Sequence, residues 1–236
     1  MIPTLGEMSW PEAARAGALL LVPFGSCEQH GPHLPLDTDT RIAVAVAEGV
    51  AAALPEGSAV VAPAVGIGAS GEHAGFPGTL SVGTAVLEEA AVELVRSADH
   101  FAAVALVNAH GGNSAALRRA VSRLRAESRN VGMVRCASPG GDSHAGRTET
   151  SLMLHLAPEL VAVDRALAGE TRPWAEVADR IVAAGVIAVS PNGVLGDPAG
   201  ATAEEGARLL GEMIEAALLS LPPSQISDRT GGKPRS

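Results

Sequence analysis

Apolar and polar positions follow two different patterns along this chain. Continuous apolar runs, typical of strands buried on both faces of a sheet, occupy residues 18–24, 59–65, 102–107 and 131–136, with a shorter run at 186–190. Segments with helical periodicity lie between and after them, at residues 40–54, 84–98, 114–127, about 149–156, 174–184 and 202–221. This alternation predicts an α/β fold with three αβα layers and a mainly parallel central sheet.

The chain length is that of one large domain. It has 236 residues, 47% of them hydrophobic, which is enough for a substantial core. No linker or internal repeat divides the sequence, so residues 1–221 are expected to form a single domain. Residues 222–236 are rich in Pro, Ser, Gly and charge, and we expect a disordered tail there.

Polar loops follow the predicted strands, and their side chains are those that bind metal ions. The first loop, residues 25–39, carries Glu28 and His30, which project to the same side if the chain stays extended. It ends at Asp39, which is either the N-cap of the next helix or a ligand. His110 follows the third strand, and Glu149 stands at a helix start. Because such loops converge beyond the strand ends of a doubly wound sheet, we predict one or two divalent cations among them.

Other polar residues in these loops suit supporting roles. Glu72 and His73 lie in the long loop after the second strand and are predicted to contact the substrate. His144, close to Glu149, is a candidate proton donor to a leaving amine; the alternative is a role at the N-terminus of that helix. His33 and Asp37 are expected to hydrogen-bond behind the ligands. The alternative for all of these loops is a set of polar side chains that are merely hydrogen-bonded.

Composition removes several classes of function. The net charge of −9 and the lack of a basic cluster argue against nucleic acid and membrane surfaces as partners. Two cysteines without a paired spacing suggest neither disulfides nor a thiolate metal site, so the expected compartment is the cytoplasm, and Cys27 is expected to be a buried, inert thiol. A GxGxxG pattern at residues 66–71 runs into further Gly and Pro rather than a helix, which argues against dinucleotide binding.

Four sequence blocks resemble, in order and spacing, those of the creatininase (creatinine amidohydrolase) family across residues 15–160. They read GSCEQHGPHLPLDTD, GASGEHAGFPGTLS, NAHGGN and HAGRTETS. The resemblance implies an amidohydrolase with two divalent metal ions, Fe²⁺ or Zn²⁺ with Mn²⁺ as a further option, in a homo-oligomer. It also implies roles for single residues: metal ligands at Glu28, His30, Asp39 and His110, with Asp39 as the bridge, and a catalytic His144.

The chain departs from creatinine hydrolases in two places. Those enzymes carry a Glu two residues after the third-strand His, where this chain has Gly112, and Glu149 is expected to replace that ligand. They also line the substrate ring with Trp, and residues 136–143 contain none. The blocks are most similar to the branch of the family that acts as a peptidase in mycofactocin biosynthesis.

This similarity implies a small modified peptide as the substrate and release of a C-terminal Val-Tyr dipeptide from it. Two alternatives remain. One is the hydrolysis of a small cyclic amide or a formamide, and the other is a metal-binding protein without turnover.

Overall fold

Four parallel strands form the centre of the molecule. The computed structural model describes residues 4–14, 17–138 and 140–222. Its sheet has the order β2-β1-β3-β4, from strands β1 (Leu19–Phe24), β2 (Ala59–Val61), β3 (Ala103–Asn108) and β4 (Val131–Arg135). The register pairs Leu19 with both Ala59 and Ala103. The predicted parallel sheet is thus confirmed, and its strand order reverses between β1 and β3, where such sheets place their sites.

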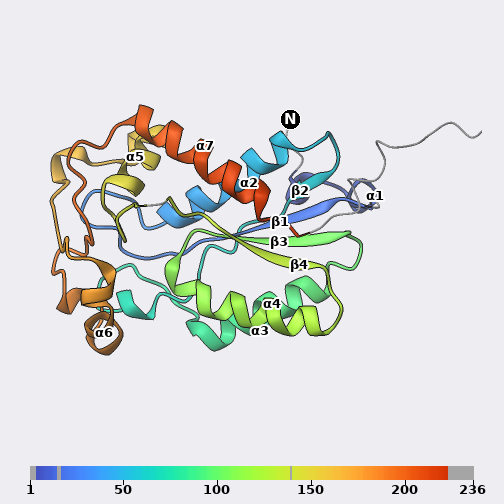
Figure 1. The fold of residues 1–236 in the computed structure, drawn as a ribbon, viewed down its shortest axis with the longest axis horizontal. Helices are drawn as coiled ribbons and strands as arrows, with labels where there is room; N and C mark the ends of the chain where they lie inside the picture. Colours follow the sequence, from blue (N-terminus) through green and yellow to red (C-terminus); the bar gives the residue numbers. More distant parts are fainter. Residues whose placement is uncertain (1–3, 15–16, 139, 223–236) are drawn as a thin grey trace, which may run out of the picture.

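Helices cover both faces of the sheet (Figure 1). On one face lie α3 (Gly83–Arg96) and α4 (Ser114–Ala126), and on the other α2 (Thr38–Ala53), α5 (Arg147–Leu156) and α7 (Ala203–Leu219). Side chains of β1 alternate between the two cores: Leu20 and Val22 pack toward α3 and α4, and Leu19 and Leu21 pack toward α2 and α7. All of β1 is buried, as a doubly covered strand requires, and the three-layer prediction is confirmed.

The short strand predicted at residues 186–190 is wrong. The chain forms a 3-10 helix η6 (Val186–Ala188) there, directly after α6 (Trp174–Ala184). Gly185, at a φ of 78°, turns the backbone between them, and Val186 is buried with Val177 and Ile181 of α6. A short apolar run indicates that the segment is buried. It does not distinguish a strand in a sheet from a turn packed against a helix.

Smaller elements complete the described chain. They are α1 (Trp10–Ala13) and the 3-10 helices η1 (Leu5–Glu7), η2 (Gly71–His73), η3 (Gly111–Asn113), η4 (Pro158–Leu160) and η5 (Val163–Arg165). Strand β2 ends at Val61 rather than residue 65, before Pro63, which has no amide hydrogen to donate to a ladder. The expected disorder of the tail concerns residues 223–236, which lie outside the described residues.

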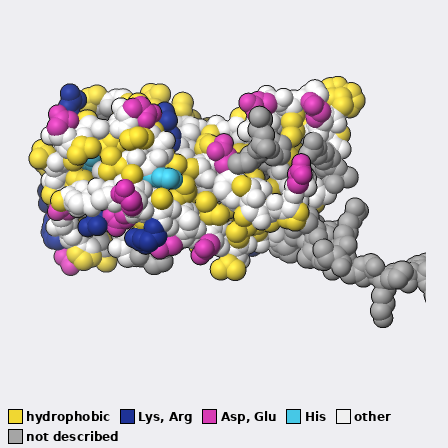
Figure 2. Space-filling view, turned by 90° about the horizontal axis from the view of Figure 1, so that it is seen from above, with side chains coloured by type: hydrophobic (Ala, Val, Ile, Leu, Met, Phe, Trp, Pro, Cys, Tyr) yellow, Lys and Arg dark blue, Asp and Glu magenta, His cyan; other side chains and the backbone are white. Residues whose placement is uncertain are grey.

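The surface of the described chain mixes charge with apolar side chains. On the face drawn in Figure 2, acidic side chains lie among apolar ones, and Lys and Arg side chains form no broad continuous patch among the residues described. Within that same part of the chain, every helix is too short or too polar to cross a membrane.

Candidate active site

The loops at the carboxyl ends of β1 and β3 meet the first turns of α2 and α5. Glu28 and His30 follow β1, and Asp39 lies in the first turn of α2, which begins at Thr38, earlier than predicted. The Asp39 side chain therefore does not cap the helix and faces the cluster instead. His110 follows β3, and Glu149 lies in the first turn of α5. The five side chains fall into overlapping sets close enough to share a metal ion, so the predicted convergence is observed.

Asp39 stands between two groups of donor atoms. Its Oδ1 lies 3.3 Å from Nε2 of His30, and its Oδ2 lies 3.1 Å from Nδ1 of His110. Glu28 joins the second group, with Oε1 3.2 Å from His110 Nδ1. Glu149 joins the first group, with Oε2 3.8 Å from His30 Nε2. Two of the sets of donor atoms that could hold a metal ion thus share the Asp39 carboxylate.

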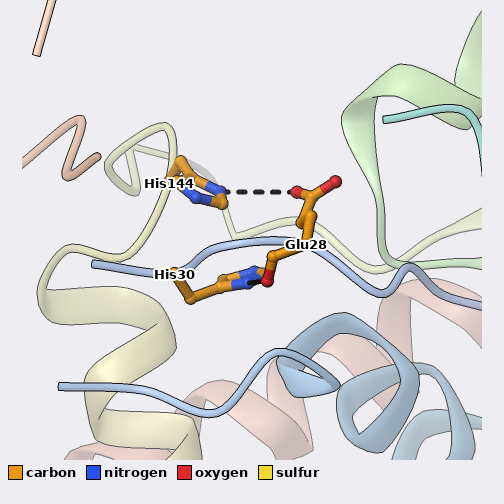
Figure 3. Close-up of side chains that lie close together, drawn as sticks. All are labelled: Glu28, His30 and His144. Carbon is orange, nitrogen blue, oxygen red and sulfur yellow. Dashed lines mark hydrogen bonds and ion pairs between the residues drawn. The ribbon is translucent and has the colours of Figure 1, made fainter. Parts of the chain in front are cut away.

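Backbone carbonyls fix the orientation of three imidazoles. His30 Nδ1 lies 3.1 Å from the Glu28 carbonyl oxygen, His110 Nε2 lies 3.2 Å from that of Ala69, and His144 Nε2 lies 2.8 Å from that of Gln29. A carbonyl oxygen only accepts, so each of these nitrogens carries a proton. The other ring nitrogen of each imidazole then points to the carboxylates. Figure 3 shows this for His144, whose Nδ1 faces the Glu28 carboxylate, and it shows His30 beside the Glu28 backbone oxygen. Metal-binding histidines typically have this arrangement.

Glu28 supplies an independent test of the metal interpretation. Its side chain is fully buried, and neither carboxylate oxygen accepts a hydrogen bond. A buried carboxylate without hydrogen bonds is costly unless a cation compensates its charge. Buried carboxylates and oriented imidazoles, without thiolate, are a donor set that suits divalent zinc, iron or manganese. The residues present therefore fit two such ions.

The pKa shifts of the clustered side chains also indicate that this site favours positive charge. Burial lowers the pKa of His30, but the neighbouring carboxylates, chiefly Asp39 with Glu149 and Glu28, together outweigh this and raise that pKa to about 10. Burial alone would raise the pKa of Asp39, yet the His30 charge and the hydrogen bond from His110 hold it well below the usual range. Burial raises the pKa of Glu149 to about 7. The cluster therefore stabilises cations strongly at its centre.

His144 and His73 form a neutral pair beside the cluster, held by Gln29. Burial holds the pKa of His144 well below its usual value and lowers that of His73 to about 3, against the opposing effect of Glu28. Gln29 Nε2 lies 2.8 Å from His73 Nδ1 and 2.9 Å from the Gly193 carbonyl oxygen. Because Nε2 of His144 already carries a proton, the two amide hydrogens of Gln29 go to these other acceptors. The Nδ1 atom of His144 is therefore directed toward the cluster, and it lies 3.8 Å from Glu28 Oε1.

A cavity of about 1100 Å³ opens beside these residues. Glu72 and His73 line it together with Glu28, His110, His144 and Glu149. Glu72 is partly exposed, and its Oε1 lies 3.8 Å from His110 Nε2. His73 is buried, with Nε2 3.4 Å from Glu28 Oε1. The structure thus brings both residues predicted to contact substrate to the wall of the cavity, His73 on the inner side.

Some supporting residues differ from expectation. Asp37 pairs with Arg41 at the surface, 2.9 Å apart, so its predicted place behind the ligands is wrong. His33 hydrogen-bonds Thr150, the neighbour of Glu149, through a contact of 2.9 Å. Cys27 is only partly buried, and its thiol faces the Gly78 carbonyl oxygen, away from the cluster.

Sequence reasoning missed Gln29 because it assumed an extended chain, which would point this side chain away. Gly31, at a φ of 66°, bends the loop instead. The Asn113 side chain makes no cap hydrogen bond at the start of α4. It instead joins three loops: its Oδ1 accepts from Ala69 N at 2.9 Å, and its Nδ2 donates to Gly25 O at 2.9 Å and to Asn108 Oδ1 at 3.2 Å.

Gly112 lies where no side chain fits. A Cβ there would lie 2.5 Å from both His110 Nε2 and Glu72 Oε1, and closer still to the Ala69 carbonyl oxygen. A carboxylate ligand at this position is therefore excluded by the packing around it, whereas Glu149 reaches the cluster from α5.

The Gly112→Ala variant is expected to bind metal roughly 10- to 100-fold more weakly, because the added methyl group displaces His110 from its Ala69 contact. Metal affinity measured by competition with a chelator checks this. Gly111→Ala is the matched control, since a Cβ at Gly111 meets no atom within 4 Å. Equal affinities of the two variants would contradict the expectation.

Comparison with known proteins agrees with this geometry. The family model for creatininase, described as creatinine amidohydrolase, matches residues 6–220. A mycofactocin precursor peptide peptidase of Mycolicibacterium smegmatis is 54% identical over 200 residues, which cover 83% of this chain and 81% of that protein.

Solved structures of creatininases superpose on the same fold. One described as a mutant of the Zn-Zn type has a TM-score of 0.76 and 26% identity, covering 92% of this chain and 95% of its own. Another, described as creatininase with Mn, has a TM-score of 0.76 and 27% identity, covering 92% and 96%. Fold, site and relatives together define a hydrolase that acts on amide bonds. The chain belongs to the creatininase family.

Proposed function

We propose that this protein is a metal-dependent peptidase that releases the C-terminal Val-Tyr dipeptide from the modified mycofactocin precursor peptide. The observation that carries the proposal is the 54% identity to a peptidase of that description, against 26–28% to creatininases of known structure. The cavity supports it, because about 1100 Å³ suits the end of a peptide better than a single small ring.

We infer two divalent ions, zinc, iron or manganese, in this site. His30, Asp39 and Glu149 would hold one ion, and Glu28, Asp39 and His110 the other. When bound, such ions polarise the scissile carbonyl and make water a nucleophile near neutral pH. The role of the chain itself is to hold these donors in a buried, oriented arrangement and to move protons.

His144 is the proton carrier in this proposal. Its Nδ1 is unprotonated and faces the cluster, so it can take a proton as water attacks and return it to the departing amine nitrogen. Gln29 is the positioning residue, since its backbone oxygen fixes the His144 tautomer and its side chain holds His73.

The homo-oligomer and the cytoplasmic location expected from the sequence remain part of the proposal. Exposed apolar side chains in and after the loop that follows β2 support self-association: Ile67, Leu80, Val82 and Val86.

Incubation of the metal-loaded protein with the modified precursor is expected to release the Val-Tyr dipeptide, which mass spectrometry detects. Creatinine and formamides, supplied in parallel, are expected to remain intact. A Glu149→Gln variant prepared in the same way is the control for contaminating peptidases. Turnover of creatinine without peptide cleavage would overturn the assignment, as would equal release by the variant.

A further inference from the structure

The cavity beside the ligand cluster has one apolar wall. It consists of Trp174 and residues 181–187, from α6 and η6, and every residue in it is apolar or glycine. Trp174, Ile181 and Val182 stand at positions i, i+7 and i+8 of α6, so they share one face of the helix. The lining from α4 and from the segment after β4 differs from this wall, because it contains charged side chains.

Three large side chains of the apolar wall are open to solvent. Trp174 is 51% exposed, Val182 83% and Ile187 43%. The chain has two tryptophans and no tyrosine, and one of those two indoles thus lies in the cavity. Exposed apolar side chains that lie together in a cavity typically bind an apolar group of a ligand.

The core beneath the apolar wall connects it to the proton carrier. Ile181 of α6 is buried in one apolar cluster with Leu195. Leu195 pairs with His144 through the backbone, since its N donates to the His144 carbonyl oxygen at 2.8 Å and its carbonyl oxygen accepts from His144 N at 3.2 Å. The turn between α6 and η6 contacts η2, because a Cβ at Gly185 would lie 3.1 Å from the Glu72 carbonyl oxygen. The apolar wall is therefore held next to the place where, in the proposed function, the leaving amine receives its proton.

We propose that the apolar wall binds the side chains of the unit that leaves, with Trp174 against the aromatic ring of its tyrosine. This inference rests on the proposed function and deepens it. The leaving unit begins at the amine nitrogen that His144 protonates, so its aliphatic and aromatic side chains lie on the side of the cavity that adjoins Leu195. Aromatic rings associate through stacked or edge-to-face contacts, and aliphatic groups gain free energy when they leave water. The apolar wall thus selects the leaving unit by its side chains.

Two substitutions in the apolar wall test this inference on the modified precursor. Trp174→Ala is expected to lower kcat/KM roughly 10-fold, mostly through KM, and Trp174→Phe, which retains a ring, is expected to restore most of the loss. Val182→Asp places a charge on the wall at an exposed position, and a similar rise in KM is expected. The matched controls are Trp10→Ala and Leu219→Asp, at exposed apolar residues outside the cavity, and both are expected to keep the wild-type KM.

The molar mass in solution, measured by light scattering, distinguishes a substrate site from an interface between copies of the chain. Variants of the apolar wall that change the molar mass and keep the wild-type KM would overturn the inference. Variants of the wall that change neither quantity would overturn it as well.

A binding measurement separates this inference from the proposed function. In a Trp10→Phe protein, Trp174 is the single tryptophan, so its fluorescence reports contact with a ring. N-acetylvaline tyramide is expected to shift this emission and to bind roughly 10-fold more tightly than N-acetylvaline ethylamide, which lacks the ring. Such binding by a protein that does not cleave the precursor would leave the inference standing and remove the peptidase assignment. Cleavage of the precursor with equal binding of the two compounds would do the reverse.

Discussion

A Glu149→Gln variant is expected to lose peptide turnover by on the order of 10³-fold, more than the roughly 10- to 100-fold typical of residues that only support a ligand. Glu149 lies beside His30 and shares with it and Asp39 one of the two donor sets. The neutral Gln side chain removes the negative charge that Glu149 contributes to the binding of a cation by this donor set. It keeps an oxygen for the hydrogen bond from Ala145 N, so the start of α5 remains supported.

Elemental analysis of the purified variant separates a lost ligand from a lost fold. We expect the metal content to fall from two ions per chain toward one, with an unchanged circular dichroism spectrum. Glu72→Gln is the matched control, because Glu72 lines the same cavity but belongs to neither donor set. Two retained ions with full turnover in Glu149→Gln would show that Glu149 does not replace a ligand at Gly112.

A His144→Gln variant is expected to lower kcat by roughly 10²- to 10⁴-fold with its metal content unchanged, because the loss removes proton transfer alone. His144 lies close enough to Glu28 and His30 to form a third donor set, so metal content is the decisive measurement. A variant that loses an ion together with its activity would identify His144 as a ligand instead. The exposed His100, changed to Gln, provides a control for the loss of an imidazole.

The sequence predicts the sheet well because parallel strands that are buried on both faces consist of continuous apolar runs. The run at 18–24 became β1 with a difference of one residue. The strand predicted at 186–190 is wrong because an apolar run indicates only that a segment is buried. It does not indicate whether the segment packs in a sheet or against a helix. The end of β2 at Val61 could be predicted from Pro63, because proline has no amide hydrogen to donate to the neighbouring strand.

Part of the candidate site could be predicted from the rule that the loops at the carboxyl ends of parallel strands lie close together. Glu28, His30 and His110 follow from that rule, and Asp39 and Glu149 follow once their helices begin beside the same strand ends. The place of Gln29 did not follow, because side-chain direction in an irregular loop depends on single backbone angles such as that of Gly31. Nor could sequence show that Gly112 is closed to any side chain, since that depends on Ala69, from another loop.

The hydrogen bonds of Asn113 divide the site into two parts with different freedom to change. One amide joins the loops after β1, β2 and β3, so the inner wall that carries the ligands behaves as one unit. The outer wall of the cavity comes from separate elements, the segment after β4 and α6, which this amide does not touch. Substrate choice can therefore be redesigned in the segment after β4 or along α6 while the amide-cleaving chemistry stays intact.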